Sequence, residues 1–439
     1  MNRAILALTL LLVNVPVSGQ SATPSGDLGQ TSPWLALSAE QRGRTERLTN
    51  LFRRNGAGSG RTLALRTRVR ADLGRPSGLL QGLVEIQDAR STLTDEPFLV
   101  PALHANELDL LQLQVRVGAD DIRGGDLDSE VRFGRFTLDL GRRRLVARNR
   151  MRNTTNAFDG AVWRLESPER WRLHILASRP VLIDPEALDS SHGTGTFWGS
   201  YYEQPMTQGW GYDVYALVVR EPADAVLARR HVTLGGRLAS RPSPGRVDIE
   251  VESAWQTGTV LARDHTAHFQ HGEVGYTWAQ AWTPRLSLHY DYASGRADAE
   301  DSDAGAFDTL FGSRRFEYGP TGIFGPFFRG NLQTPGARLS ISPHTRVEVT
   351  TMSRGFWLAD AGDRWLGTAL VDPAGQSGSF VGTLFEVETR VTLVDVLAFE
   401  AGYAHLFKGR FADSAPGSPG TPDSQYFYAG WEVLLPDSR

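Results

Sequence analysis

The chain has 439 residues, no cysteine and a formal net charge of −4. The lack of cysteine excludes a disulfide framework, a thiolate metal site and a cysteine nucleophile. The overall acidic charge argues against a nucleic-acid-binding protein. The basic residues are nevertheless nearly all arginine, with Lys408 as the single lysine, and arginine binds carboxylates in a bidentate geometry that lysine cannot match.

The N-terminus has the pattern of an export signal. A positive start (residues 1–3) is followed by an apolar run at residues 4–13 that is too short to span a bilayer, and then by small residues. We predict a secretory signal peptide at residues 1–19 and a loose lead-in at residues 20–36. No later stretch offers about 18 uninterrupted apolar residues, so no membrane-spanning helix is predicted.

Residues 37–439 carry alternating apolar and polar positions. At residues 37–50, Ser38 and Gln41 could open a helix as a capping box, but the charged residues alternate as in a strand, and the strand is favoured. Residues 61–73 are the clearest strand, because leucine and valine occupy one face and arginine the other over some thirteen residues. That length suits a tilted barrel strand with its apolar face in lipid.

The same pattern returns at residues 79–90, 110–118, 246–258, 285–295, 381–393 and 427–435. Long polar links, such as residues 185–195, 296–305 and 413–425, alternate with short turns, as they do in outer-membrane barrels. We therefore predict an all-β, transmembrane antiparallel barrel as a single domain in the outer membrane of a Gram-negative bacterium. A secreted β-helix or an array of β-sandwiches is the soluble alternative.

One stretch, residues 131–160, is unusually rich in arginine. Eight arginines lie between Arg132 and Arg152, yet residues 131–140 and 145–151 alternate like two strands around Gly141. A wall with a polar inner face and a water-filled lumen accommodates such charge more easily than a soluble sheet. A solvated basic hairpin or a nucleic-acid patch is the alternative.

If the apolar face of each strand points outward, charged side chains of both signs point into the lumen. These are Arg66, Arg68, Arg70, Arg135, Arg237, Arg338 and Arg354, with Asp139, Asp213, Glu250, Glu252, Asp291 and Glu386. A lumen lined mainly by arginine would favour an anionic solute. The alternative is that these charges pair with one another and simply fill the wall.

No motif in the sequence argues for catalysis or for a cofactor. On a strand, His265 and His271 share a face and His268 points the other way, which makes a shared metal site improbable. The acidic residues between Asp298 and Asp308 lack the order of a calcium loop. No G-x-S-x-G elbow occurs, and the glycines of residues 56–60 indicate a turn. We predict no metal and no cofactor.

Several segments resemble the alginate-export family of outer-membrane barrels. They are GRFTLDLGRRRLVARNRMRNTTNAFDG (134–160), LVEIQDAR (83–90), TLGGRL (233–238), AWQTG (254–258), EVGYTW (273–278), RLSLHYDYASG (285–295), FDTLF (307–311), GNL (330–332), FWLAD (356–360) and EAGYAHLFKGRF (400–411). They occur in the family's order. The resemblance implies a barrel of about 18 strands with an arginine-lined constriction that passes a polyuronate.

The resemblance also implies which residues line the substrate path. The arginines that match are Arg42, Arg44, Arg66, Arg68, Arg135, Arg144, Arg148 and Arg152, and the carboxylates are Asp139, Asp159 and Asp291. Two departures stand out. The family's His-x-Tyr-Tyr-Gly run is replaced by residues 315–319, RFEYG, and the last strand is followed by residues 436–439 without a terminal aromatic residue.

These observations predict a monomeric, non-enzymatic porin for an anionic polysaccharide or a smaller acidic solute. Its partners would be outer-membrane lipid and, for export, periplasmic proteins. The alternatives are a barrel enzyme that acts on lipid or polysaccharide at the rim, and a plugged structural barrel.

Overall fold

The computed structural model describes residues 34–435 except 57, 76–77, 93–100, 121–125, 168–169, 223–227 and 297–303. The predicted signal peptide and nearly all of the lead-in lie outside the described residues. Of the helices in the described part of the chain, none has the length and apolar character needed to cross a membrane.

Strands make up almost all of the regular structure. The wall strands are β1 (Leu35–Thr49), β2 (Ser59–Leu73), β3 (Leu80–Thr92), β4 (Asn106–Ala119), β5 (Asp128–Phe136), β6 (Phe158–Ser167), β7 (Trp171–Leu182), β9 (Thr196–Gln204), β10 (Trp210–Glu221), β11 (Arg229–Ser240), β12 (Val247–Val260), β13 (Arg263–Thr277), β14 (Arg285–Ala293), β15 (Leu332–His344), β16 (Val347–Trp357), β17 (Phe380–Val394), β18 (Leu397–Lys408) and β19 (Ser424–Leu435). The short elements are β8 (Ser190–Ser191), α1 (Pro101–His104), a 3-10 helix (Met206–Gln208), α2 (Arg315–Tyr318) and α3 (Arg410–Ser414).

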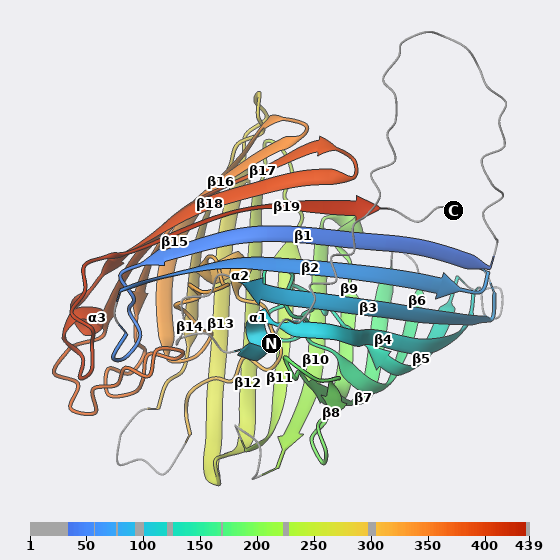
Figure 1. The fold of residues 1–439 in the computed structure, drawn as a ribbon, viewed down its shortest axis with the longest axis horizontal. Coiled ribbons are helices and arrows are strands. Elements are labelled where there is room, and N and C mark those ends of the chain that lie inside the picture. Colours follow the sequence, from blue (N-terminus) through green and yellow to red (C-terminus); the bar gives the residue numbers. More distant parts are fainter. Residues whose placement is uncertain are drawn as a thin grey trace, which may run out of the picture.

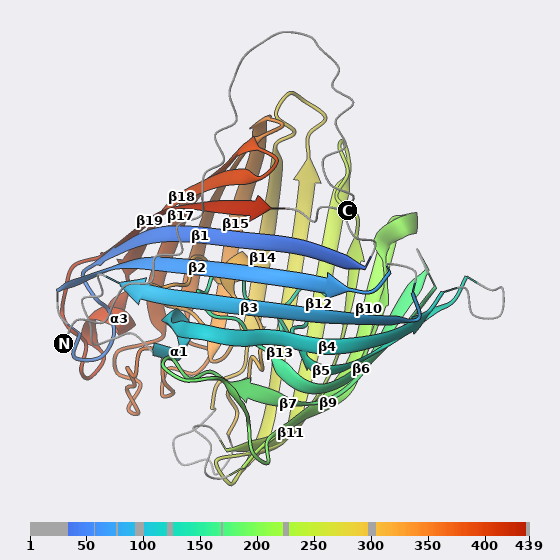
Figure 2. The ribbon, with the colours of Figure 1, turned by 45° about the vertical axis from the view of Figure 1, so that its right-hand side comes forward.

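These 18 wall strands form a closed antiparallel barrel (Figures 1 and 2). Each strand pairs with its neighbour in the chain, and β1 pairs with β19 over a register that runs from Ala39–Leu435 to Thr49–Gln425. The two-residue β8 pairs only with β7 and stands outside the ring. The predicted barrel of about 18 strands is confirmed, and so is the strand at residues 37–50.

Strand β2 illustrates why this sequence forms a wall. Arg66 and Arg68 are 2% and 6% exposed and point inward, whereas Leu65 and Val69 are 38% and 44% exposed and point outward. Successive strand residues point to opposite faces, so one alternating sequence supplies both a polar interior and an apolar band for lipid.

The connections differ between the two ends of the barrel. One end carries short turns, such as residues 345–346 and 395–396, and the other carries long loops at residues 137–157, 294–331 and 358–379. In outer-membrane barrels the short turns face the periplasm and the long loops face the outside.

The arginine-rich stretch is only partly a strand. The prediction of a second strand at residues 145–151 is wrong: β5 ends at Phe136, and residues 137–157 form an irregular segment, here called the inward loop. Asn149, inside the predicted strand, has a positive φ angle of 59°, which lies outside the β region of backbone conformation. The guanidinium groups alternate in the sequence as in a strand, but they bond to groups inside the barrel instead of forming one face of a wall.

Two apolar clusters occupy the inside of the barrel toward the long loops. The first combines loop residues such as Phe324, Trp365 and Phe411 with inward-facing wall residues such as Leu48 and Tyr426. The second joins the start of the inward loop to β6, β9, β10 and β13. Both clusters are built from loops packed against the wall, so the long loops fold into the barrel.

Candidate lumen constriction

The inward loop is held against β1 and β2 by arginines of the wall. Arg42 donates from Nη2 to the carbonyl of Arg152 at 3.1 Å, and also bonds the carbonyl of Arg150. Arg44 donates from Nη1 to the carbonyl of Met151 at 2.5 Å, and Arg66 donates to the carbonyl of Arg152 at 3.2 Å. Because a loop leaves its carbonyl groups without a ladder partner, these guanidinium groups replace the missing sheet bonds.

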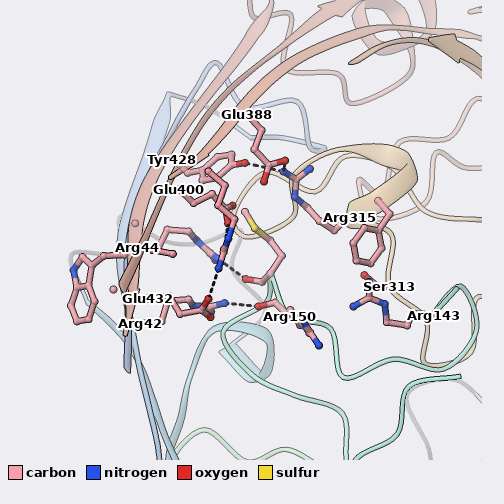
Figure 3. A pocket seen from close by; sticks show the side chains of 17 residues that line it. Arg42, Arg44, Arg143, Arg150, Ser313, Arg315, Glu388, Glu400, Tyr428 and Glu432 are labelled. Atoms are coloured by element: carbon pink, nitrogen blue, oxygen red, sulfur yellow. Dashed lines mark hydrogen bonds and ion pairs between the residues drawn. The ribbon is translucent and has the colours of Figure 1, made fainter. Parts of the chain in front are cut away.

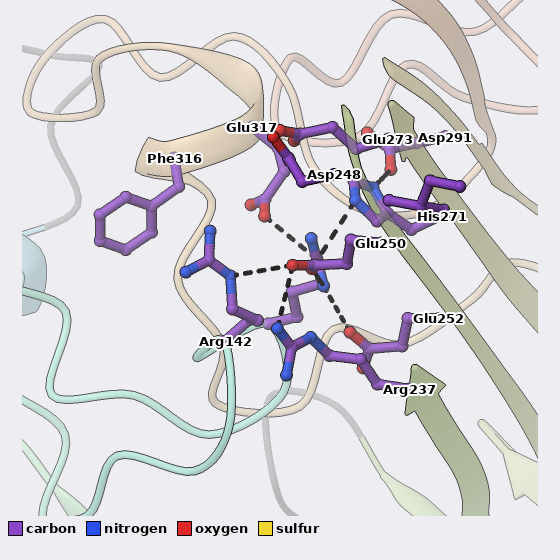
Figure 4. Close-up of polar contacts among 12 residues, drawn as sticks. Arg142, Arg237, Asp248, Glu250, Glu252, His271, Glu273, Asp291, Phe316 and Glu317 are labelled. Carbon is purple, nitrogen blue, oxygen red and sulfur yellow. Dashed lines mark hydrogen bonds and ion pairs between the residues drawn. The ribbon is translucent and has the colours of Figure 1, made fainter. Parts of the chain in front are cut away.

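The same loop is fastened to the opposite wall by Arg144, which pairs with Glu250 and Glu252 of β12. Figure 4 shows these two carboxylates together with Glu317. The Arg144 side chain is 2% exposed, and its nitrogens lie 2.7 Å from Glu250, 2.5 Å from Glu252 and 3.1 Å from Glu317. Burial alone would lower the pKa of Arg144, but the three carboxylates raise it well above its usual range. In the ring, β12 stands across from β1 and β2, so the inward loop crosses the lumen.

A second loop, residues 294–331, is joined to the first. Val146 and Phe311 form a parallel β-bridge, and Arg329 donates to the carbonyl of Arg144 at 2.8 Å. Arg329 also pairs with Glu317 at 3.0 Å, so Glu317 receives an arginine from each loop. The two loops therefore form one unit across the barrel.

A cavity of about 400 Å³ lies between this unit and the wall formed by β1, β17, β18 and β19 (Figure 3). Its lining is rich in charge: six arginines and three glutamates contribute to it, namely Arg42, Arg44, Arg143, Arg150, Arg315 and Arg390, with Glu388, Glu400 and Glu432. Its volume is in the range typical of small-molecule sites.

The arginines of this cavity are of two kinds. Arg315 lies 2.8 Å from Glu386 and Arg390 lies 3.0 Å from Glu432, so these charges are compensated. Among the described residues, Arg42, Arg143 and Arg150 form no ion pair. Arg42 bonds only to oxygens of the inward loop, and its Nε is buried without a partner. Three of the six arginines at the cavity therefore have no carboxylate partner among the described residues.

A smaller cavity of about 280 Å³ shares Arg315, Phe316 and Glu388 with the first. Phe316 of α2 is 37% exposed, and the guanidinium carbon of Arg143 lies 4.1 Å from the centre of its ring. This cation–π contact holds Arg143 at the junction of the two cavities.

The remaining arginines that the resemblance implied lie around the inward loop. Arg68 is buried on β2 and bonds to Gln87 and to the hydroxyl of Thr155, and Arg148 lies 3.2 Å from Glu85. Arg152 bonds to Asn156 at 2.6 Å, and burial lowers its pKa to about 10. These side chains fasten the loop instead of standing free.

Two of the expected path residues lie elsewhere. Arg135 is directly opposite Leu113 of β4 and Asp159 of β6, and Leu113 is 51% exposed on the outer face. Directly opposed residues share a face of the sheet, so the prediction that Arg135 faces the lumen is wrong. Arg135 and Asp159 instead form a 2.8 Å ion pair at the rim, where Ser191 also bonds to Asp159. Gly134, the residue before Arg135 on β5, has a φ angle of 117°, a backbone conformation that favours glycine.

The other two expected carboxylates, Asp139 and Asp291, lie inside the barrel and have partners there. Asp139 lies on the inward loop, where it accepts a bond from the backbone of Arg148 at 2.8 Å. Asp291 is buried on β14 between Arg354, at 2.6 Å, and His271. His265 and His271 share one face of β13, as expected, and that face is the buried, inward one. The described residues contain no group of three His, Cys, Asp or Glu side chains suited to a metal ion.

Comparison with known proteins decides the family. The model of the alginate export family matches residues 33–422. The chain belongs to the alginate export family. A search of curated protein sequences finds no match.

Solved structures with the same fold are outer-membrane proteins of low sequence identity. The chain is similar to Pseudomonas aeruginosa OpdO, with a TM-score of 0.60, 12% identity and coverage of 92% of this chain and 98% of that one. It is also similar to P. aeruginosa OccD3 (OpdP), with a TM-score of 0.59, 11% identity and coverage of 92% of this chain and 91% of that one. The likeness to Acinetobacter baumannii OccAB1 has a TM-score of 0.59, 11% identity and coverage of 91% of this chain and 97% of that one. These structures show the shared barrel fold, and the family match makes this chain a porin barrel of the Gram-negative outer membrane.

Sequence reasoning did not select some of the residues that line the larger cavity. Arg150 lies in the segment that was expected to be a strand, and Arg143 lies between the two expected strands. Arg315 lies in the RFEYG run that departs from the family pattern. Arg390 alternates correctly with Val391 on β17, so its inward orientation could have been predicted.

Proposed function

We propose that this protein is a passive, non-enzymatic porin for an anionic polysaccharide, such as an alginate-like polyuronate, or for a smaller acidic solute. The observation that carries the proposal is the cavity in which Arg42, Arg143 and Arg150 form no ion pair with the described residues. An uncompensated guanidinium in a narrow lumen attracts a carboxylate and repels cations.

The mechanism would be an exchange of carboxylates between neighbouring arginines. A carboxylate entering the cavity would trade water for the guanidinium of Arg42 or Arg150, and then pass to the next free guanidinium. Arg44, Arg66, Arg68, Arg144, Arg148 and Arg152 would support this path by fixing the inward loop, together with Asp139 and Asp291. Several sites of moderate affinity allow both entry and release.

The buried polar groups of the lumen favour no catalytic reading. His271 contacts Asp291, as a catalytic base contacts its orienting acid, but its other ring nitrogen is buried without a hydrogen-bond partner and lies 3.8 Å from Glu250. We therefore propose a transport role with no cofactor, a monomeric barrel in outer-membrane lipid, and periplasmic proteins as partners if the solute is exported.

A plugged structural barrel is the second candidate, because the two apolar clusters occupy the long-loop end of the lumen. Transport through that end would require the loops to move. Conductance separates the two candidates, since a permanently plugged barrel carries no current.

The test is the reversal potential of the purified protein in a planar bilayer under a KCl gradient, repeated with added oligouronate. The proposal expects anion selectivity and block by oligouronate. Arg42→Gln combined with Arg150→Gln should weaken both effects, whereas Arg241→Gln with Arg246→Gln, in an exposed short turn, should not. Cation selectivity would contradict the proposal, and the absence of current would favour the plugged barrel.

A further inference from the structure

Arginines form two cross-strand pairs on the outer face of the wall. Arg220 of β10 lies directly opposite Arg230 of β11, and Arg47 of β1 lies directly opposite Arg61 of β2. All four side chains are exposed. Like charges in directly opposed positions destabilise a sheet, so an anionic partner that neutralised them would be favoured at the Arg220–Arg230 pair.

The alternation of the strands places these pairs outside the lumen. Arg220 shares its face with Val214, which is 57% exposed, and Arg230 shares its face with Leu234, which is 52% exposed. On the other side of the ring, Arg61 follows the parity of the exposed Leu65. The arginines therefore continue the lipid-facing rows and do not belong to the polar rows that line the lumen.

Aromatic residues fix the depth of the pairs in the membrane. Trp198 of β9, 52% exposed, lies opposite Val218, one outward position before Arg220. Phe427 of β19, 47% exposed, lies directly opposite Arg47. Aromatic side chains on the outer face of a barrel mark the level of the lipid headgroups. Both pairs lie at the strand ends that lead into the long loops, which is the level of the outer leaflet.

Within the described residues, Arg47, Arg220 and Arg230 form no ion pair. Arg230 of β11 lies opposite Thr259 of β12, which lies opposite Asp264 of β13. The carboxylate in this outer row is therefore two strands away from Arg230. Two strand spacings amount to about 10 Å, a distance at which exposed charges are largely screened.

We propose that the Arg220–Arg230 pair binds a phosphate group of the outer-leaflet glycolipid. Two adjacent guanidinium groups offer several N–H donors in a fixed geometry that matches the oxygens of one phosphate, and a phosphate at headgroup depth would neutralise the like charges. The acyl chains of the same lipid would lie against the apolar outer rows below. This site is independent of the lumen and of what passes through it.

The test is a titration of the purified, folded barrel in detergent with bis-phosphorylated lipid A, followed by native mass spectrometry. Replacement of this pair by glutamine (Arg220→Gln with Arg230→Gln) should weaken lipid binding by about tenfold or more, because charge-assisted hydrogen bonds are lost. Replacement of the same residues by lysine should retain part of the binding and excludes misfolding as the cause.

The matched control is Arg241→Gln with Arg246→Gln, which removes the same charge from an exposed turn at the opposite end of the barrel. Equal weakening in the control, unchanged binding in the glutamine variant, or equal binding of dephosphorylated lipid A would overturn the proposal. Pairing of two barrels without lipid would identify a second copy as the partner and also overturn it.

Discussion

Arg144 and Glu252 stand 108 residues apart in the chain, yet Nη1 of Arg144 lies 2.5 Å from a carboxylate oxygen of Glu252, and both side chains are almost fully buried. This contact ties the inward loop to the wall opposite the arginines of β1 and β2. The position of the loop in the lumen therefore depends on one cation that is shared by three acids.

Replacing Arg144 by methionine should release the inward loop from β12. Removal of one partner from a buried ion pair leaves uncompensated charge and costs about 3–5 kcal/mol. We expect faster amide exchange over residues 137–157 and larger fluctuations of the single-channel current. Arg142→Gln is the matched control, because Arg142 is 53% exposed and reaches Glu250 at only 3.5 Å. Equal effects of the two substitutions would contradict the role of Arg144.

Arg135 provides a test of which arginines act on permeating ions. Because Arg135 shares the outer row with Leu113 and is paired with Asp159, Arg135→Gln should leave the reversal potential unchanged. Arg42→Gln removes an uncompensated charge from the cavity and should shift the potential toward cation selectivity. A larger shift from Arg135→Gln than from Arg42→Gln would show that the path does not follow the cavity.

Gly312 lies where the two inward-folding loops touch. A Cβ atom at this position would lie 1.8 Å from the carbonyl oxygen of Arg144, so Gly312→Ala cannot keep the contact between the loops. We expect increased proteolysis of residues 137–157 in the folded barrel. Gly193→Ala serves as the control, because a Cβ there meets nothing within 4 Å. Protection equal to that of the unsubstituted protein would refute the close approach.

The loop after β7 should depend on pH through Asp189. Burial and the neighbouring Asp109 raise the pKa of Asp189 from 3.8 to about 7. The folded loop therefore holds a proton that the unfolded loop loses above pH 4. Its local stability should fall as pH rises from about 4 to about 7 and then level off.

Amide exchange of residues 183–195, corrected for the intrinsic rate, measures this effect and should report more opening at pH 8 than at pH 5. Asp189→Asn keeps a neutral side chain at every pH and should abolish the difference. A stability that rises with pH in the unsubstituted protein would have the wrong sign for this mechanism.

The wall of this barrel could be predicted from sequence because each strand carries its own two-residue period. The alternation of Arg66 with Leu65 indicates which face of β2 points inward, and many strands with such a pattern predict a closed barrel. The same period misled at residues 145–151, where Arg148 pairs with Glu85, 63 residues away, and the carbonyls of Arg150 and Met151 accept bonds from wall arginines. The position of Arg135 was also predicted wrongly, because its carboxylate partner, Asp159, lies at the rim of the barrel and not in the lumen.

The candidate site was harder to predict than the wall. Arg143 and Arg315 enter the cavity from irregular segments, and no local period describes where a loop folds back. Arg143 is positioned by its contact with Phe316, and Arg315 by its ion pair with Glu386. Both partners are distant in sequence.

The closure of β1 against β19 also has a consequence for the order of assembly. The apolar cluster beneath the long loops joins Leu48 and Phe52, near the start of the chain, to Phe411 and Tyr426, near its end. Contacts of such large sequence separation form late in folding. The interior can therefore be completed only after the first and last strands have paired. A chain that is still inserting into the membrane would be an open sheet whose long loops are not yet packed inside it.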